Sequence, residues 1–247
     1  MQLWLCPLIA FLLGSIPFGL IIARAKGINI REHGSGNIGA TNVLRVIGKK
    51  YGITCLLLDA LKGFIPVVIA INLIQIDGKN LAFFHIGALD AYNVTLPAAQ
   101  QFQGQLVHIL TALAAVLGHN YSPWVGFRGG KGIATSAGVL LGLMPAGVVL
   151  LIFVWLAVFL VSRYVSLASI IAAAALPLVT HIGARLHHLN NDKSQPTLWE
   201  AGTWNKPLFF FSLVIAILAI WKHRSNIQRL CTGTEHRFTR RSESGHV

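Results

Sequence analysis

The sequence has few charged residues. Asp, Glu, Lys and Arg together make up 11% of its 247 residues, whereas about 25% is usual for soluble domains. Hydrophobic residues make up 54%, and the mean hydropathy is +0.64. A chain of this composition lacks the polar side chains that would cover a water-soluble globule. The composition therefore excludes a soluble enzyme, a secreted disulfide scaffold and a disordered chain, and it indicates a membrane protein.

Acidic residues are the scarcest charged ones: there are eight Asp and Glu against 20 Lys and Arg, so the net charge is +12 at pH 7. In a membrane protein such an excess first reflects topology and attraction to acidic lipid headgroups. Anionic substrates are the second explanation. We therefore expect membrane lipids and small anions as partners, and no nucleic acid.

Cysteines are also few and scattered. Cys6 and Cys55 lie inside apolar runs and Cys231 stands alone, so we expect thiols and no disulfide framework. The N-terminus lacks the positive charges that begin a signal peptide. The apolar run from Leu3 to Ala23 has 21 residues, roughly 31 Å of helix, so it predicts a spanning helix.

Seven charge-poor segments are expected to cross the membrane as helices of a single all-α domain. The stretch 133–162 is long for one span, and Gly142-Leu-Met-Pro145 is suited to a turn inside it. With that turn, 16 of the 20 Lys and Arg lie on the cytoplasmic side, whereas a single span leaves 12 there. The sequence therefore predicts an outside N-terminus and a cytoplasmic tail over 222–247. The expected spans are about 3–23, 51–75, 105–118, 133–143, 145–162, 165–184 and 207–221.

The first candidate site is a glycine-rich loop before the second span, in the predicted cytoplasmic segment 24–50. Glycines let successive backbone N–H groups turn toward one point, and hydroxyl and amide side chains add donors. An arginine can grip a phosphate with two hydrogen bonds. The alternative is a glycine turn that caps the following helix. The density of donors favours an anion site, with candidates Ser35, Gly36, Asn37, Thr41, Asn42 and Arg45.

A second glycine-rich segment follows Gly118-His-Asn120 in the predicted cytoplasmic segment 119–132. Backbone amides at a helix start, together with two cations, favour phosphate. The spacing does not match a nucleotide P-loop. The alternative is a tight turn whose cations only set the topology. The candidate phosphate-binding residues are Gly129, Gly130, Lys131 and Gly132.

The third segment ends the last span. On a continuing helix His223 and Asn226 would share one face, where an imidazole and an amide could receive a proton and bind a hydroxyl. Ser166, from the predicted cytoplasmic turn 162–166, is a candidate for the same cleft. Asp59 and Lys62 lie within the second span, where ionisable groups are costly unless they pair or line a polar cavity. A structural role is favoured for this pair.

Three motifs now stand together and in order: Ser35-Gly-Asn-x-Gly-Ala-Thr-Asn-x-x-Arg45, Gly129-Gly-Lys-Gly132 and His223-x-x-Asn-Ile-x-Arg-Leu-x-x-Gly-x-Glu235. With them the chain resembles, almost end to end, the bacterial acyl-phosphate:glycerol-3-phosphate acyltransferases, the PlsY family. The resemblance implies a seven-helix inner-membrane enzyme with its active site on the cytoplasmic face. Such an enzyme acylates the 1-hydroxyl of glycerol 3-phosphate from acyl phosphate, and it needs no metal, nucleotide or other cofactor.

The resemblance also implies roles for residues of the three motifs. It makes Ser35 and Arg45 catalytic, the glycine–lysine loop around Lys131 a glycerol 3-phosphate site, His223 and Asn226 essential for activity, and Glu235 a structural anchor. An acyl phosphate is already a good acyl donor, and the chain has no Gly-x-Ser-x-Gly nucleophile motif, so direct transfer is expected. Either His223 or a phosphate oxygen of the substrate takes the hydroxyl proton, and we favour the phosphate oxygen.

Two other interpretations were weighed. Basic loops and short helices would also suit a membrane transporter of phosphorylated metabolites, although the sequence shows no inverted repeat. His85 and Asp90 have the spacing of another class of glycerolipid acyltransferases, but the predicted topology places them in the outer loop 76–104. His187, His188 and Asp192, in the outer loop 185–206, lack a coherent metal-ligand pattern. The enzyme that forms acyl phosphate is a further expected partner.

Overall fold

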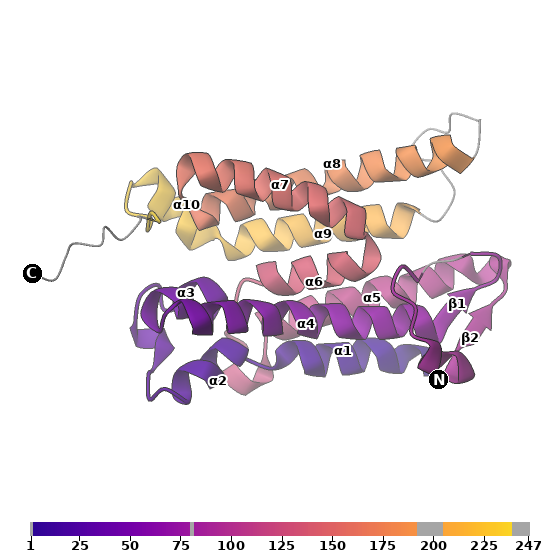
Figure 1. The fold of residues 1–247 in the computed structure, drawn as a ribbon, viewed down its shortest axis with the longest axis horizontal. Helices are drawn as coiled ribbons and strands as arrows, with labels where there is room; N and C mark the ends of the chain where they lie inside the picture. The colour runs from indigo at the N-terminus through magenta and orange to yellow at the C-terminus, as the bar shows by residue number, and fades with distance from the viewer. Residues whose placement is uncertain (1, 80–81, 192–204, 239–247) are drawn as a thin grey trace, which may run out of the picture.

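A computed structural model describes residues 2–79, 82–191 and 205–238, and most of these residues are helical (Figure 1). Two three-residue strands, β1 (Ile74–Ile76) and β2 (Val94–Leu96), pair in parallel, which the sequence did not predict. The helices are α1 (Leu5–Ser15), α2 (Phe18–Arg24), α3 (Ala40–Val46), α4 (Lys49–Leu73), α5 (Gln101–Asn120), α6 (Ile133–Leu143), α7 (Pro145–Ser162), α8 (Val165–Asn191), α9 (Asn205–Lys222) and α10 (Arg224–Cys231).

The helices form two layers (Figure 1). In one layer α1 packs on α5 and α4 packs on α6, and in the other α8 packs between α7 and α9. The chain passes from one layer to the other at Met144, between α6 and α7. Leu140, Leu176 and Ile215, from α6, α8 and α9, belong to one buried cluster. A shared apolar core therefore joins the two layers.

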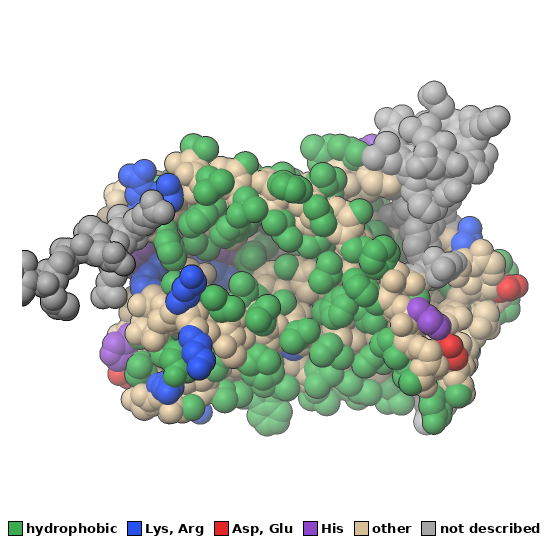
Figure 2. Space-filling model, in the orientation of Figure 1, with side chains coloured by type: hydrophobic (Ala, Val, Ile, Leu, Met, Phe, Trp, Pro, Cys, Tyr) green, Lys and Arg blue, Asp and Glu red, His purple; other side chains and the backbone are tan. Residues whose placement is uncertain are grey.

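The outer surface of the helices is that of an integral membrane protein. Large apolar side chains such as Phe153 and Ile217, 64% and 67% exposed, face outward, and apolar residues cover the middle of the molecule in Figure 2. Four helical stretches in the described residues are long and apolar enough to cross a membrane, and α9 with α10 adds a fifth if that bent pair is one span. The four stretches are Leu5–Arg24, Lys49–Leu73, Pro145–Ser162 and Val165–Gly183.

Two of the seven predicted spans do not meet these criteria. Helix α6 has only 11 residues, roughly 16 Å, about half the thickness of a hydrocarbon core. Helix α5 has 20 residues but includes three Gln and two His side chains. The seven-span topology therefore stays a prediction.

The first span is not one continuous helix, and the helix that forms the last span does not continue through His223 to Asn226; both findings correct the prediction. Pro17 cannot continue a helix and restrains the residue before it, so α1 ends at Ser15 and α2 begins at Phe18. The chain also bends by 55° between α9 and α10. His223 lies at that bend, as the residue that precedes α10, so it does not lie on a continuing helix with Asn226.

The predicted outer loops contain more regular structure than expected. The segment 76–104 holds β2, and α5 already begins at Gln101. Helix α8 runs on to Asn191 instead of ending near 184, through residues that have no Gly or Pro to stop it. The break expected within 133–162 lies at Met144, where α6 stops and Pro145 starts α7.

Candidate active site

A cavity of about 430 Å³ lies between the two layers. Along α8 its wall changes from Ser166 and Ser169 to Ala173 and Leu176, so one end is polar and the other apolar. The apolar wall is completed by Leu140, Val148, Leu151, Ile152, Trp155 and Ile215. The polar wall contains Ser35, Asn37, Thr41, Asn42, Arg45, Lys131, His223, Asn226, Arg229 and Glu235. All three motifs therefore meet at one place.

The first glycine-rich loop is held together by Asn42. Its side-chain oxygen accepts the Ser35 N–H at 2.9 Å, and its amide nitrogen donates to the carbonyls of Ile30, His33 and Asn37 at 2.9 to 3.3 Å. Asn42 was predicted to bind phosphate, but its amide is already engaged by the loop. Its role in the structure is to fix the loop at the start of α3.

Gly36 also shapes the loop instead of facing the cavity. It has a φ of +68°, and its N–H donates to the His33 carbonyl at 3.1 Å. Gly36 is not part of the cavity wall. Since its N–H is already bonded within the loop, this geometry lends no support to phosphate binding by Gly36, which stays a prediction.

Other side chains of this loop remain available to a ligand. Ser35, Thr41 and Arg45 line the cavity, and their side chains make no hydrogen bond within the described residues. Asn37 accepts the Gly39 N–H through its side-chain oxygen at 3.0 Å. Burial lowers the pKa of Arg45, the nearby Glu235 raises it and Arg229 lowers it again. An arginine stays charged despite such a shift, so this part of the wall is a cationic donor set.

In the glycine–lysine loop, the first two glycines serve packing and not the cavity. The Gly129 N–H donates to the Asn120 carbonyl and the Gly130 N–H to the His119 carbonyl, both at 3.2 Å. Neither glycine lines the cavity. A Cβ at Gly129 would collide with the His119 carbonyl oxygen, so only glycine fits there. Both N–H groups hold the loop on α5 in this structure, so phosphate binding by these two amides stays a prediction that the geometry does not support.

The end of the same loop does face the cavity. Lys131, Gly132 and the first residues of α6, Ile133 and Ala134, line it. The first N–H groups of a helix have no partner inside that helix and carry partial positive charge. The start of α6 together with the Lys131 ammonium is therefore the part of this loop that can hold an anion.

A chain of hydrogen bonds joins this loop to the third motif. The Lys131 ammonium donates to the side-chain oxygen of Asn226, and the Asn226 amide donates to Glu235 at 2.7 Å. Glu235 also accepts the Ser166 hydroxyl at 2.8 Å and pairs with Arg229 at 2.7 Å. Asn226 and Ser166, predicted as site residues, thus line the cavity with their donors turned toward Glu235. Glu235 therefore joins α8 to α10 directly, and it reaches the Lys131 loop through Asn226.

The pKa values of Lys131 and Glu235 reflect their burial and the charged and polar groups around them. Burial lowers the pKa of Lys131 to about 8, against the attraction of Glu235. Burial alone would raise the pKa of Glu235, but the hydrogen bonds from Asn226, Ser166 and Arg229 hold it below its ordinary value. At neutral pH the carboxylate is therefore ionised and most Lys131 side chains carry a proton.

His223 presents one ring nitrogen to the cavity. Its Nδ1 lies 2.8 Å from the Ala219 carbonyl oxygen, so Nδ1 carries the proton and Nε2 keeps a lone pair. Burial, and next the charge of Lys131, lower the pKa of His223 to about 4. The imidazole is therefore neutral at pH 7, and Nε2 can accept a hydrogen bond from a hydroxyl.

Asp59 and Lys62 form the buried ion pair that the sequence suggested. Lys62 Nζ lies 2.8 Å from Asp59 Oδ1 and donates to the Ile16 carbonyl at 2.6 Å. That carbonyl is accessible because the helix breaks before Pro17. His119 Nδ1 lies 3.7 Å from the same Asp59 oxygen. The pair is thus part of a larger buried cluster.

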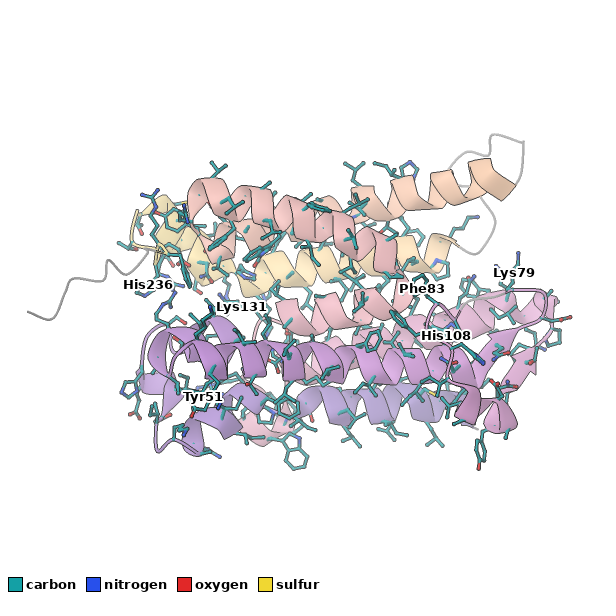
Figure 3. All side chains as sticks on the ribbon, in the orientation of Figure 1. Tyr51, Lys79, Phe83, His108, Lys131 and His236 are labelled. Carbon is teal, nitrogen blue, oxygen red and sulfur yellow. The ribbon has the colours of Figure 1, made fainter. Side chains whose placement is uncertain are left out.

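Three ionisable residues of the cavity wall were not among the predicted site residues: His119, Arg229 and His236. His119 and Arg229 stand inside the motifs that the sequence displayed, so their motif position was an available signal. His236 follows Glu235 directly and lies with Lys131 at the end of the molecule that carries α3 and α10 (Figure 3). Lys and Arg side chains gather at this end (Figure 2).

The rejected histidine sites lie away from the cavity. His85 pairs with Asp90 at 3.2 Å, and these side chains are 58% and 48% exposed. His187 and His188 belong to the far end of α8, whereas Asp192 lies outside the described residues. No group of three or more His, Cys, Asp or Glu side chains in the described part of the chain could hold a metal ion.

Comparison with known proteins gives matches along nearly the whole chain. A sequence profile of the family described as glycerol-3-phosphate acyltransferase matches residues 4–233. The glycerol-3-phosphate acyltransferase of Aquifex aeolicus is 42% identical over 229 residues, which cover 93% of this chain and 95% of that protein. The glycerol-3-phosphate acyltransferase of Geobacter sulfurreducens is 40% identical over 231 residues, 93% and 94% of the two chains.

The fold has solved counterparts as well. A crystal structure of PlsY, an integral membrane glycerol 3-phosphate acyltransferase, in its glycerol 3-phosphate form matches with a TM-score of 0.69 and 39% identity, covering 97% of this chain and 96% of that one. Its lysophosphatidic acid form matches with a TM-score of 0.67 and 38% identity over the same shares. The chain therefore belongs to the PlsY family of integral membrane glycerol-3-phosphate acyltransferases.

Proposed function

We propose that this protein transfers a fatty acyl group from an acyl phosphate to the 1-hydroxyl of glycerol 3-phosphate, with lysophosphatidate and phosphate as products. The observation that carries the proposal is a single cavity whose cationic, donor-rich end adjoins an apolar wall. Both substrates bear a phosphate, and one also bears a fatty chain. The glycerol 3-phosphate and lysophosphatidic acid forms of the related PlsY structures support the acceptor and the product.

The two phosphates are assigned to the two cationic parts of the wall. The start of α6 and Lys131 bind glycerol 3-phosphate, as the family resemblance implies for the glycine–lysine loop. Arg45 and Ser35 bind the phosphate of the acyl donor and stabilise it as it leaves. The apolar wall around Leu140 and Leu176 takes the acyl chain.

The transfer is direct. The 1-hydroxyl oxygen of glycerol 3-phosphate attacks the acyl carbonyl carbon, the bond from that carbon to the phosphate oxygen breaks, and phosphate leaves with the electron pair. His223 Nε2 accepts a hydrogen bond from the hydroxyl and orients it. The proton passes to a phosphate oxygen of the substrate, because the phosphate dianion is a stronger base than the His223 imidazole. The conjugate acid of the dianion has a pKa of about 6, whereas the pKa of His223 is about 4.

The proposed setting is the bacterial inner membrane, with one membrane domain of seven spans, an outside N-terminus and a cytoplasmic active site. Two observations support this orientation. The described ends of the chain lie at opposite ends of the molecule (Figure 1), and Lys and Arg gather at the end that carries the cavity's polar wall (Figure 2). The enzyme that forms acyl phosphate would deliver its product to that face.

The test supplies purified protein in detergent with glycerol 3-phosphate and, separately, palmitoyl phosphate, palmitoyl-CoA and palmitoyl-acyl carrier protein. We expect lysophosphatidate and one equivalent of phosphate from palmitoyl phosphate alone. Product from either thioester, or a covalent acyl-enzyme trapped without acceptor, would contradict the proposal. A transporter would move labelled glycerol 3-phosphate into vesicles and form no product.

A further inference from the structure

Beneath the glycine–lysine loop lies a cluster of polar side chains from three helices. Asp59 and Lys62 come from α4, His119 and Asn120 from the end of α5, and Thr135 from α6. They are between 0% and 6% exposed. Ionisable groups buried at membrane depth face a partner or a functional cavity as a rule. Asp59 and His119 line the cavity, so the cluster borders the site.

The imidazole of His119 lies between this charge pair and the loop. On one side its Nδ1 faces Asp59 Oδ1 at 3.7 Å, while Lys62 holds the same carboxylate at 2.8 Å. On the other side its Nε2 edge abuts Gly130, where an added Cβ would collide with the ring. The ring thus fills the space between a fixed carboxylate and the backbone of the loop.

The backbone of α5 holds the same loop from below. The carbonyls of His119 and Asn120 accept the N–H groups of Gly130 and Gly129. The next residue, Lys131, reaches into the cavity and bonds Asn226. If the His119 ring moves, we therefore expect the backbone of Gly130 to move with it. Gly130 directly precedes Lys131, so the position of the Lys131 ammonium should change as well.

From this geometry we infer that His119, oriented by Asp59, is a positioning residue that sets where Lys131 meets the phosphate of glycerol 3-phosphate. The inference rests on the proposed function of Lys131. It assigns no proton transfer to His119. Its direct consequence is that the ring and Gly130 are coupled through a shared contact.

The first test measures steady-state kinetics of His119→Ala and Asp59→Asn for both substrates. We expect the KM for glycerol 3-phosphate to rise about tenfold in His119→Ala, with the KM for acyl phosphate within twofold of the original. His119→Gln, whose amide reaches toward Gly130, should recover most of the loss. The matched control is His108→Gln: His108 is a buried histidine of the same helix whose Nε2 bonds the Ile74 carbonyl at 2.9 Å, at the opposite end of the molecule (Figure 3). It should leave both KM values unchanged.

The second test is a double-mutant cycle that stays informative if a single variant is destabilised. Gly130→Ala should raise the KM for glycerol 3-phosphate because its Cβ strikes the ring. In His119→Ala that collision is gone, so adding Gly130→Ala should change the KM by less than twofold. Effects that multiply, or equal rises in both KM values, would overturn the inference.

Ligand-induced thermal stabilisation separates this inference from the proposed function. Glycerol 3-phosphate should raise the melting temperature of the unaltered protein, and less so that of His119→Ala. If it stabilises both equally, the positioning role of His119 is overturned and the proposed function stands. If it does not stabilise the unaltered protein, the glycerol 3-phosphate site itself is wrong. The proposed function and the inference about His119 are then both contradicted.

Discussion

Replacing Lys131 by Met tests the phosphate site with a known perturbation. The change removes the ammonium but keeps most of the apolar stem, so packing against α6 is largely preserved. Lys131 has a pKa of about 8, so at pH 7 about nine-tenths of the molecules carry the charge that Met lacks. A hydrogen bond to a charged group contributes about 1.5–3 kcal/mol. At 1.36 kcal/mol for each factor of ten, kcat/KM for glycerol 3-phosphate should fall roughly 10- to 150-fold.

The assay follows lysophosphatidate formation at pH 7 while each substrate is varied in turn. Lys79→Met is the matched control, because Lys79 is exposed at the opposite end of the molecule (Figure 3) and should leave the kinetics unchanged. Melting temperatures show whether Lys131→Met is folded. A folded Lys131→Met protein whose kcat/KM for glycerol 3-phosphate falls less than threefold would refute the assignment of this phosphate to Lys131.

Three further predictions follow from the site. The value of kcat/KM for glycerol 3-phosphate should rise as the pH increases through about 6, where the phosphate becomes a dianion. It should fall above about pH 8, where Lys131 loses its proton. A fall that occurs only at about pH 10 would contradict the lowered pKa of a buried Lys131. Glu235→Gln keeps the shape but not the charge that Arg229 binds. It should reduce stability by about 1–3 kcal/mol in a reversible unfolding assay and lower kcat, and unchanged values would show that the link is dispensable. Ala173→Phe fills the apolar wall, so activity with a 16-carbon acyl phosphate should fall at least tenfold more than with an 8-carbon one, and equal losses would place the acyl chain elsewhere.

Much of the site was predictable from the sequence because its chemistry is local. The first loop, the glycine–lysine loop and the third motif each carry hydroxyl, amide or cationic groups within a few residues. Positive charges assigned all of them to one face of the membrane. The structure brings Ser35, Lys131 and His223 to one cavity.

What the sequence did not reveal are the roles that depend on contacts between distant segments. Gly129 and Gly130 look like phosphate ligands in isolation, but their N–H groups bond carbonyls of α5. Asn42 likewise fixes its own loop instead of a ligand. His119 gains its importance from Asp59, sixty residues earlier in the chain. Whether such an N–H or amide group bonds another part of the protein or faces the cavity depends on how distant segments pack. The spacing of residues in the sequence does not reveal this packing.

The fold, like the site, was predictable from the sequence only in part. Apolar runs located most of the helices, but the run from Leu3 to Ala23 contains Pro17, and the proline interrupts the helix despite the hydropathy around it. The bend at His223 leaves no such mark in the sequence. Both interruptions help to build the site: one frees the Ile16 carbonyl for Lys62, and the other turns α10 so that Asn226 meets Lys131.

The central claim is that three distant segments form one anion-binding pocket on the cytoplasmic side. It is tested most directly by single cysteines at Ser35, Lys131 and Asn226, placed in a chain whose Cys6, Cys55 and Cys231 are replaced by Ala or Ser. A maleimide that does not cross membranes is added to right-side-out and inverted vesicles. We predict labelling of all three only in inverted vesicles, with glycerol 3-phosphate slowing the labelling at positions 35 and 226. Labelling of any one of them from the outside would contradict the account.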